Sequence, residues 1–373
     1  MKKTPGGERM NKMRKKKTVI ILASVFGVMF CVCIGCLIYC GIMTFYTRYT
    51  DDGTFAAVPA EYKEKAAEQG KIISITYKTS TYYAEETWPN SNVTAEVFAS
   101  YTAREDVALE KKIYVYLPYG YDETDGQNYN ILYHMHGTKC DGTTLIKGEG
   151  RDSEMKRLLD NMISKGDMEP AIVVFPTWYQ GLDLDEKDPD YLISHFGTEL
   201  KQDIMPAVET QFHTYAELTK DMTGAEMEQA FANSRAHRAV SGYSRGGVLT
   251  WNVFANMQSC FHWYIPMSGD YRCELFIATP ESCTAKTQDL VLRLEEQGYG
   301  KEDFFIYSTV GALDLAYKGV AMQFNTMLQY PDRFVYGKNM AGGNFYLCTA
   351  PKVWHGDTKA PMFFYNALRV IFN

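Results

Sequence analysis

The sequence lacks several patterns that would indicate a metal centre, a redox centre or a nucleic-acid partner. The cysteines beyond residue 46 contain no C-x-x-C pair, which gives a zinc or thioredoxin-like site little support. No internal repeat or low-complexity tract is present, which disfavours a repeat architecture. No basic stripe follows residue 17, and this disfavours binding of nucleic acid.

Five cysteines remain beyond residue 46, namely Cys140, Cys260, Cys273, Cys283 and Cys348. Because the number is odd, they cannot all pair within one chain. Cys273 and Cys283 are close enough in sequence to form a loop disulfide in an oxidising compartment, and free buried thiols fit the sequence equally well.

Charge is also missing from a long N-terminal stretch. No charged residue occurs from Val19 to Phe45, which is long enough to span a bilayer as one helix. Residues 1–17 carry eight Lys/Arg against one acid, a charge of +7, and subtracting this from the chain total of −7 leaves −14 for residues 18–373. A basic flank before an apolar helix favours a cytoplasmic N-terminus.

These charges predict four segments along the chain. We expect a basic cytoplasmic tail over residues 1–17, a single-pass transmembrane anchor over 18–46, a polar spacer over 47–70 and an extracellular domain over 71–373. A cleaved signal peptide is the alternative, although no Ala-x-Ala-like site follows the apolar run. The hydrophobic fraction of 46% is enough for a large core in the last segment.

Strand and helix patterns alternate from residue 71 onward, which predicts an α/β fold with a mostly parallel sheet covered on both faces. Continuous apolar runs fit strands that are buried on both sides. The predicted strands are Ile72–Tyr77, Lys112–Leu117, Tyr129–Met135, Ala171–Pro176, Ala239–Tyr243, Trp263–Met267, Phe304–Thr309 and Asn344–Thr349. Helices are expected over Ser153–Lys165 and over Glu199–Phe212, the second with a kink at Pro206.

The motif around Ser244 organises the rest of the chain. Gly242-Tyr243-Ser244-Arg245-Gly246 follows a predicted strand and precedes a predicted helix, which is the context of a nucleophile elbow. A serine hydroxyl is a weak nucleophile and needs a histidine base oriented by a carboxylate. The partners are therefore sought downstream, in the order acid and then histidine.

Two histidines follow Ser244 in the sequence. His262 begins an apolar strand segment and is interpreted as structural, whereas His355 lies in a loop after the last predicted strand, where this fold places its base. Asp314 follows the preceding strand and is the favoured acid; Asp270, one strand earlier, is the competitor. Ser244, Asp314 and His355 are thus the predicted nucleophile, acid and base.

A tetrahedral intermediate also needs backbone N–H donors for its oxyanion. The amide of Arg245, directly after the nucleophile, is one expected donor. The loop His136-Gly137-Thr138 follows a strand, and the amide of Thr138 is the expected second donor. His134 and His136 form an H-x-H pair, but no third ligand is in view, so no metal site is predicted.

Taken together, these motifs resemble the esterase D superfamily, and within it the feruloyl esterases of carbohydrate esterase family one. The resemblance covers roughly residues 70–373 and rests on residues 112–122, His136-Gly137, residues 242–247, residues 268–271, residues 314–317 and residues 343–346. It implies the same triad of Ser244, Asp314 and His355, the α/β-hydrolase fold, and cofactor-free hydrolysis of hydroxycinnamoyl esters on plant cell-wall sugars. Two departures are Arg245, where the family has methionine or glutamine, and Gly356-Asp357, where an aromatic residue often follows the histidine.

Aromatic residues follow two of the predicted strands and are candidates for substrate contact. Trp178, Tyr179 and Tyr271 are expected at the carboxyl ends of strands, where α/β folds bind ligands, although each ring could equally cover core. The expected substrate is an ester-decorated carbohydrate or a small aryl or alkyl ester. An acetyl-xylan-type esterase, an acyltransferase and a non-catalytic surface glycan-binding domain remain alternatives.

Overall fold

The computed structural model describes residues 54–80, 108–124, 126–179, 189–273 and 277–372, together with residues 16, 24 and 27–39. The chain divides into two compact units, Met1–Tyr49 and Thr50–Asn373. In the first unit, residues 27–39 are helical. Among the described residues, no helix has both the length and the apolar character needed to cross a membrane. Much of the predicted anchor, residues 18–46, lies outside the described residues.

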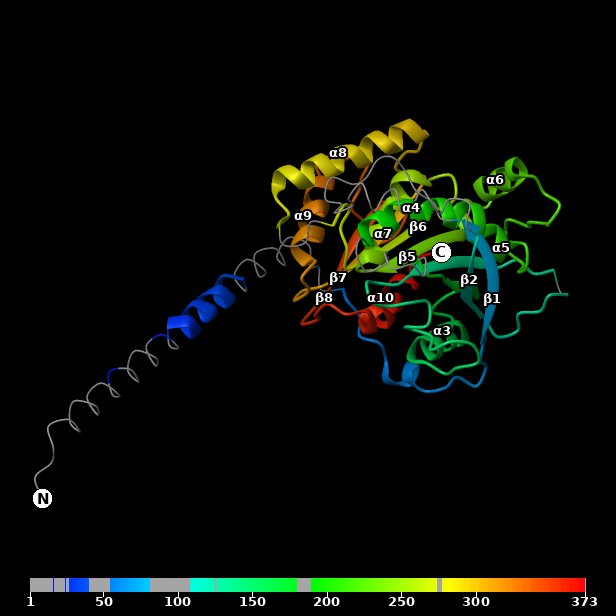
Figure 1. Cartoon of the computed structure of the whole chain (residues 1–373), viewed down its shortest axis with the longest axis horizontal. Coiled ribbons are helices and arrows are strands. Elements are labelled where there is room, and N and C mark those ends of the chain that lie inside the picture. The colour runs from blue at the N-terminus through cyan, green and yellow to red at the C-terminus, as the bar shows by residue number, and fades with distance from the viewer. Residues whose placement is uncertain are drawn as a thin grey trace, which may run out of the picture. The chain divides into compact units, whose positions relative to one another are not determined.

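The second unit contains one mixed sheet. Within its described residues, eight strands lie in the order β1-β2-β4-β3-β5-β6-β7-β8 (Figure 1). Strands β1 and β2 are antiparallel to their neighbours, and all pairings from β4 to β8 are parallel. The bounds are β1 Lys71–Ser80, β2 Ala108–Leu117, β3 Asn130–Met135, β4 Ala171–Phe175, β5 Arg238–Tyr243, β6 Trp263–Met267, β7 Phe305–Gly311 and β8 Phe345–Ala350. Each predicted strand is found, with ends that shift by a few residues.

Helices cover both faces of this sheet, as expected for a parallel sheet whose strands are buried on both sides. Helices α3 and α10 lie on one face, and α4, α7, α8 and α9 lie on the other (Figure 1). The bounds are α3 Glu154–Ser164, α4 Pro189–Glu199, α5 Met205–Glu209, α6 Gly224–Asn233, α7 Arg245–Asn256, α8 Pro280–Gln297, α9 Tyr317–Met327 and α10 Ala360–Ala367. The strands β4 to β8 are buried along their whole length.

Local sequence explains where the predicted helices begin and end. The hydroxyl of Ser153 accepts a hydrogen bond from the Lys156 amide and caps α3, and Gly166 follows that helix at φ 75°. The helix expected over Glu199–Phe212 is instead the end of a longer helical run. In it α4 passes into a π-helical turn at Leu200–Ile204 before α5. Pro206 lies in the first turn of α5, directly after the π-helical turn, so its missing N–H falls where the run changes from π- to α-helical bonding.

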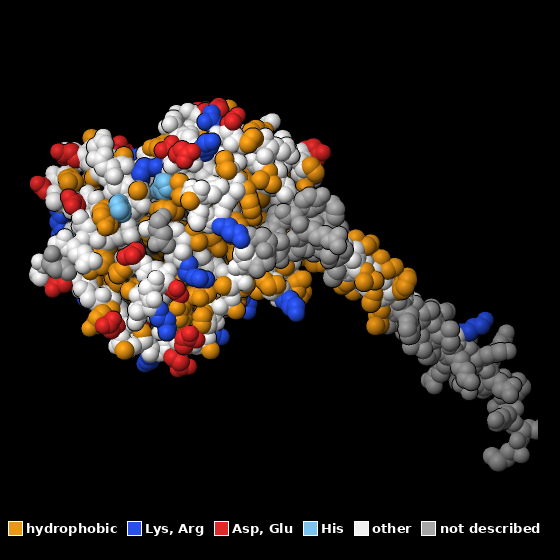
Figure 2. All heavy atoms as spheres, turned by 180° about the vertical axis from the view of Figure 1, so that it is seen from behind, with side chains coloured by type: hydrophobic (Ala, Val, Ile, Leu, Met, Phe, Trp, Pro, Cys, Tyr) orange, Lys and Arg blue, Asp and Glu red, His pale blue; other side chains and the backbone are white. Residues whose placement is uncertain are grey.

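Charged side chains are dispersed over the face of this unit that Figure 2 draws. Figure 2 shows acidic and basic side chains interspersed on the face that it draws, with hydrophobic side chains between them. No large area of that face carries charge of one sign.

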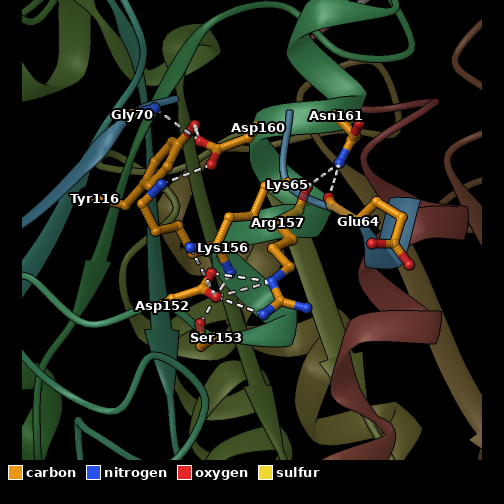
Figure 3. Close-up of polar contacts among 10 residues, drawn as sticks. All are labelled: Glu64, Lys65, Gly70, Tyr116, Asp152, Ser153, Lys156, Arg157, Asp160 and Asn161. Atoms are coloured by element: carbon orange, nitrogen blue, oxygen red, sulfur yellow. Dashed lines mark hydrogen bonds and ion pairs between the residues drawn. The ribbon is translucent and has the colours of Figure 1, made fainter. Parts of the chain in front are cut away.

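The segment before β1 is packed onto the sheet unit (Figure 3). It contains one 3₁₀ turn, η1 Ala60–Lys63. The side chains of Arg157 and Asn161 on α3 donate to the carbonyls of Lys63 and Glu64 at 2.9 Å each. Most of the predicted spacer, residues 47–70, therefore belongs to the compact unit that begins at Thr50.

A buried carboxylate fixes the end of this segment. Asp160 is 3% exposed and accepts hydrogen bonds from the Gly70 amide at 2.8 Å, the Tyr116 hydroxyl at 2.9 Å and the Lys156 ammonium at 2.7 Å (Figure 3). Since both oxygens of this buried carboxylate are satisfied, the entry into β1 has one well-defined position relative to α3.

Candidate active site

Ser244 lies at a sharp turn between β5 and α7. Its backbone has φ 55° and ψ −116°, a conformation that a residue with a side chain adopts only when its surroundings enforce it. The Ser244 amide donates to the Met267 carbonyl at 2.9 Å, and the Ser244 carbonyl accepts from the Val248 amide at 3.0 Å. The strand on one side and the helix on the other thus hold the strained residue in place.

Two glycines allow this turn to close. A Cβ on Gly242 would lie 2.2 Å from the Gly246 carbonyl oxygen, and a Cβ on Gly246 would lie 2.1 Å from the Met135 carbonyl oxygen. Neither contact is possible for any larger residue. The second contact also shows that the start of α7 lies against the end of β3, where the loop His136-Gly137-Thr138 begins.

The structure brings together Ser244, His355 and Asp314. His355 Nε2 lies 2.9 Å from Ser244 Oγ, and His355 Nδ1 lies 2.7 Å from Asp314 Oδ1. An ionised carboxylate only accepts hydrogen bonds, so Nδ1 carries the proton and Nε2 is free to accept from the serine hydroxyl. Asp314 is fully buried after β7, and the His355 side chain is 22% exposed in the loop after β8. The arrangement can transfer a proton from Ser244 to His355 and stabilise the resulting imidazolium.

Further contacts orient the carboxylate of Asp314. The Ala316 amide donates to Oδ1 at 2.8 Å, and the Tyr243 hydroxyl donates to Oδ2 at 3.4 Å. The same hydroxyl accepts from the Gly356 amide at 2.8 Å, so Tyr243 links the acid loop to the histidine loop. Burial and the nearby Asp314 charge raise the pKa of Tyr243, which keeps it a hydrogen-bond donor. This role of Tyr243 was not predicted from the sequence, although the residue precedes the nucleophile.

The competing acid, Asp270, has a different partner. It is 1% exposed and forms an ion pair with Lys286 on α8, whose Nζ lies 2.6 Å from Asp270 Oδ2. His262, the other downstream histidine, lies at the opposite end of β6 from Ser268, and burial lowers its pKa to about 4. Of the two acids considered, the structure therefore places Asp314 beside His355.

The loop after β3 is held by several side chains. His136 Nδ1 is hydrogen-bonded to the Gly137 carbonyl and His136 Nε2 to the Thr177 hydroxyl, both at 2.8 Å. Burial lowers the pKa of His136 to about 4 and that of His134 to about 3, so both rings are neutral at pH 7. The residues that the structure describes contain no group of three or more His, Cys, Asp or Glu side chains placed to hold a metal ion.

The aromatic residues proposed for substrate contact differ in exposure. Trp178 is fully buried; its ring stacks on His136 at 5.1 Å, and its indole N–H donates to the His136 carbonyl at 2.8 Å. Tyr271 is 3% exposed and donates its hydroxyl to Asp289 at 2.7 Å. Both rings pack against protein, which fits core better than a ligand surface. Tyr179 is partly exposed, and its hydroxyl accepts from the Lys139 amide at 2.8 Å.

The sequence predicted no role at the site for two residues beside His355, Trp354 and Asp357, although Gly356-Asp357 departs from the family pattern. Trp354 directly precedes His355 in the chain and is 62% exposed, while Trp178, Trp251 and Trp263 are buried. Asp357 accepts a hydrogen bond from the Gly137 amide at 2.8 Å. The only sequence feature that could have indicated a role for these two residues is that both lie within two positions of His355.

Cys273, Cys283 and Arg245 are three further residues for which the sequence raised a question. Cys273 and Cys283 are thiols, and no disulfide joins the cysteines that the structure describes. The Arg245 side chain lies next to the Cys273 thiol; burial raises the pKa of that thiol, and the Arg245 charge partly offsets the rise. The Arg245 side chain thus extends toward the loop after β6, while its amide stays at the elbow.

Comparison with known proteins identifies the family of this chain. Residues 107–336 match the protein family described as "Putative esterase". Over 263 residues the chain is 32% identical to endo-1,4-beta-xylanase Y of Acetivibrio thermocellus. The chain belongs to this esterase family. The match covers 70% of the esterase and 22% of the xylanase, so the esterase spans about a fifth of that relative.

Solved structures show the same fold. The esterase is 28% identical to a serine-to-alanine mutant of the feruloyl esterase module from Clostridium thermocellum complexed with sinapinate, with a TM-score of 0.66 and coverage of 86% of this chain and 94% of that one. A carbohydrate esterase family one ferulic acid esterase from Anaeromyces mucronatus in complex with ferulic acid has a TM-score of 0.52 at 16% identity, covering 84% and 96% of the two chains, and shows the fold alone. The protein is a carboxylic ester hydrolase of the feruloyl-esterase-like type.

Proposed function

We propose that this esterase hydrolyses feruloyl or related hydroxycinnamoyl esters on plant cell-wall polysaccharide. Ser244 is the nucleophile, His355 the base, Asp314 the acid, and the amides of Arg245 and Thr138 bind the oxyanion. The observation that carries the proposal is the continuous hydrogen-bonded series from Asp314 through His355 to Ser244 at the elbow. The neighbour that binds sinapinate and the relative that is a xylanase support the choice of substrate class.

The reaction proceeds by two acyl transfers. Ser244 Oγ attacks the ester carbonyl while His355 Nε2 takes its proton, and the carbonyl oxygen becomes an oxyanion that accepts from the two amides. When the intermediate collapses, the bond to the sugar oxygen breaks and His355 returns the proton to the leaving alcohol. A water molecule then repeats the attack on the acyl-serine, which releases the acid and restores the hydroxyl.

A substrate panel tests the choice of acyl group. The full chain is assayed with methyl ferulate, methyl sinapinate and an acetyl ester of xylose, and kcat/KM is measured for each. We expect both aryl esters to be cleaved at least about tenfold better than the acetyl ester, because even one methylene bound in a hydrophobic pocket is worth roughly 1–3 kcal/mol and a ring adds more apolar surface than that. Preference for the acetyl ester would favour the acetyl-xylan alternative. Transfer of the acyl group to added xylose in place of water would favour the acyltransferase.

We also propose that residues 18–46 anchor the esterase in the cell membrane, with residues 1–17 cytoplasmic and the enzyme unit outside. The charge asymmetry of the N-terminus supports this orientation. After expression in bacteria, alkaline carbonate washing should leave the full chain with the membranes, and it should release a chain that starts at Thr50. Release of both chains would contradict the anchor, and shortening of the full chain at residues 40–50 would indicate a cleaved signal peptide.

A further inference from the structure

Asp357 connects two loops of the site that are far apart in the sequence. It lies two residues after His355, at the start of the 3₁₀ turn η5 Asp357–Lys359. Its Oδ1 accepts a hydrogen bond of 2.8 Å from the amide of Gly137, in the loop after β3. The loop that carries the histidine is thereby bonded directly to the loop expected to bind the oxyanion.

The contact is close and specific to this pair of residues. A Cβ on Gly137 would lie 2.7 Å from Asp357 Oδ2 and 2.9 Å from Oδ1, so only glycine lets the carboxylate approach the backbone. The thiol of Cys140 lies near the same carboxylate, and burial together with the Asp357 charge raises the pKa of Cys140 to about 11. Asp357 is therefore bonded to the loop at Gly137 and lies near it at Cys140.

This contact decides which amide can serve the oxyanion. The Gly137 N–H is already directed at Asp357, which leaves the next amide, that of Thr138, as the donor from this loop. An oxyanion donor acts only if it is held in place before the reaction. The loop's other contacts include those from Thr177 and Trp178 to His136, which lies before Gly137, and one after it, from the Lys139 amide to the Tyr179 hydroxyl at 2.8 Å. Asp357 is the partner that holds Gly137 itself, directly before Thr138.

We propose that Asp357 is a positioning residue that fixes the oxyanion loop, residues 136–140, against the loop that carries His355. The inference rests on the proposed function of the site but not on its acyl preference. The carboxylate acts by accepting the Gly137 N–H and filling the space beside it. The negative charge of Asp357 contributes little to the reaction rate, because its two effects oppose each other. It would stabilise the imidazolium of His355 and destabilise the oxyanion.

Three variants separate geometry from charge. Asp357→Asn keeps an acceptor oxygen of the same reach and removes the charge. Asp357→Glu keeps the charge but adds a methylene that pushes the carboxylate into the Gly137 backbone. Asp357→Ala removes the acceptor. Asp303→Ala is the matched control, because Asp303 Oδ2 accepts from the Gly300 amide at 2.7 Å in a loop before β7, at the opposite end of the strand from Asp314.

The test uses 4-nitrophenyl acetate, so that its result does not depend on the natural acyl group. For each full-length variant kcat, KM, the thermal midpoint and the inhibition constant of phenylboronic acid are measured, because a boronic acid forms a tetrahedral adduct with a reactive serine. We expect Asp357→Ala and Asp357→Glu to lose roughly 10- to 100-fold in kcat, less than the loss of a whole oxyanion donor. Boronate affinity should fall in parallel, and KM should change less than about threefold.

Asp357→Asn and Asp303→Ala should keep kcat and boronate affinity within about threefold of the unmodified enzyme. The proposal is overturned if Asp357→Asn loses as much as Asp357→Glu, or if kcat falls while boronate affinity does not. Full activity of Asp357→Glu would also overturn the proposal. This measurement still tests the proposal if Asp357→Ala fails to fold. Failure of the proposed function looks different, because the unmodified enzyme would then hydrolyse the ester no faster than Ser244→Ala.

Discussion

Replacing Ser244 with alanine is expected to lower kcat by roughly four to six orders of magnitude, as loss of the nucleophile does in other serine hydrolases. The remaining His355 and the backbone amides can only assist direct attack by water. Steady-state turnover of methyl ferulate measures the loss. Mass spectrometry of the unmodified enzyme, quenched during turnover, should show an acyl adduct that the variant does not form.

The matched control for this substitution is Ser241→Ala. Ser241 lies on β5, the strand that leads to Ser244, but its hydroxyl is hydrogen-bonded to His134 Nδ1 at 2.9 Å and not to His355. This variant should keep kcat within about tenfold even if its thermal midpoint falls. Comparable turnover by Ser244→Ala and the unmodified enzyme would favour the non-catalytic glycan-binding alternative.

Replacing Asp314 with asparagine is expected to lower kcat by roughly 10⁴-fold with little change in KM. The amide cannot hold the proton on His355 Nδ1 as the carboxylate does, and the other tautomer would turn an N–H toward Ser244. The base would then be unable to accept the serine proton. Stopped-flow or steady-state kinetics on the same ester would measure the effect.

Asp270→Asn distinguishes between the two candidate acids. Asp270 is paired with Lys286, so its substitution leaves a buried ammonium without its counter-charge and should mainly reduce stability, by roughly 3–5 kcal/mol. We expect kcat of the folded protein to stay within about tenfold. If Asp270→Asn loses activity and Asp314→Asn does not, the assignment of the acid is wrong.

Much of this architecture could be predicted from the sequence because each strand is a short apolar run with its own turn signals. The elbow could also be predicted, because its glycines and its serine lie within a few residues of one another in the sequence. Chain order then indicated Asp314 and His355, because the fold places one loop residue after each of two late strands.

The remaining features depend on contacts between distant segments. The hydrogen bond from the Gly137 amide to Asp357 joins residues 220 positions apart, and no local sequence pattern predicts it. Trp178 and Tyr271 follow strands as expected, yet their rings pack back onto His136 and beside Asp289, and periodicity carries no information about such a rotation. The π-helical turn at Leu200–Ile204 was also not predicted, because apolar periodicity does not distinguish a single π-helical turn within a longer helical run.

The packed segment of residues 54–70 affects how the esterase would respond to mechanical load. A pull from the N-terminal side reaches the bonds between Ala56 and Asn366 on α10, then those to Arg157 and Asn161 on α3, and then the Gly70 bond to Asp160, before it reaches β1. Strand β1 is an edge strand that could otherwise be peeled from β2 one residue at a time. Because α10 and α3 take the load first, the bonds to these two helices would have to break before tension could separate β1 from the sheet.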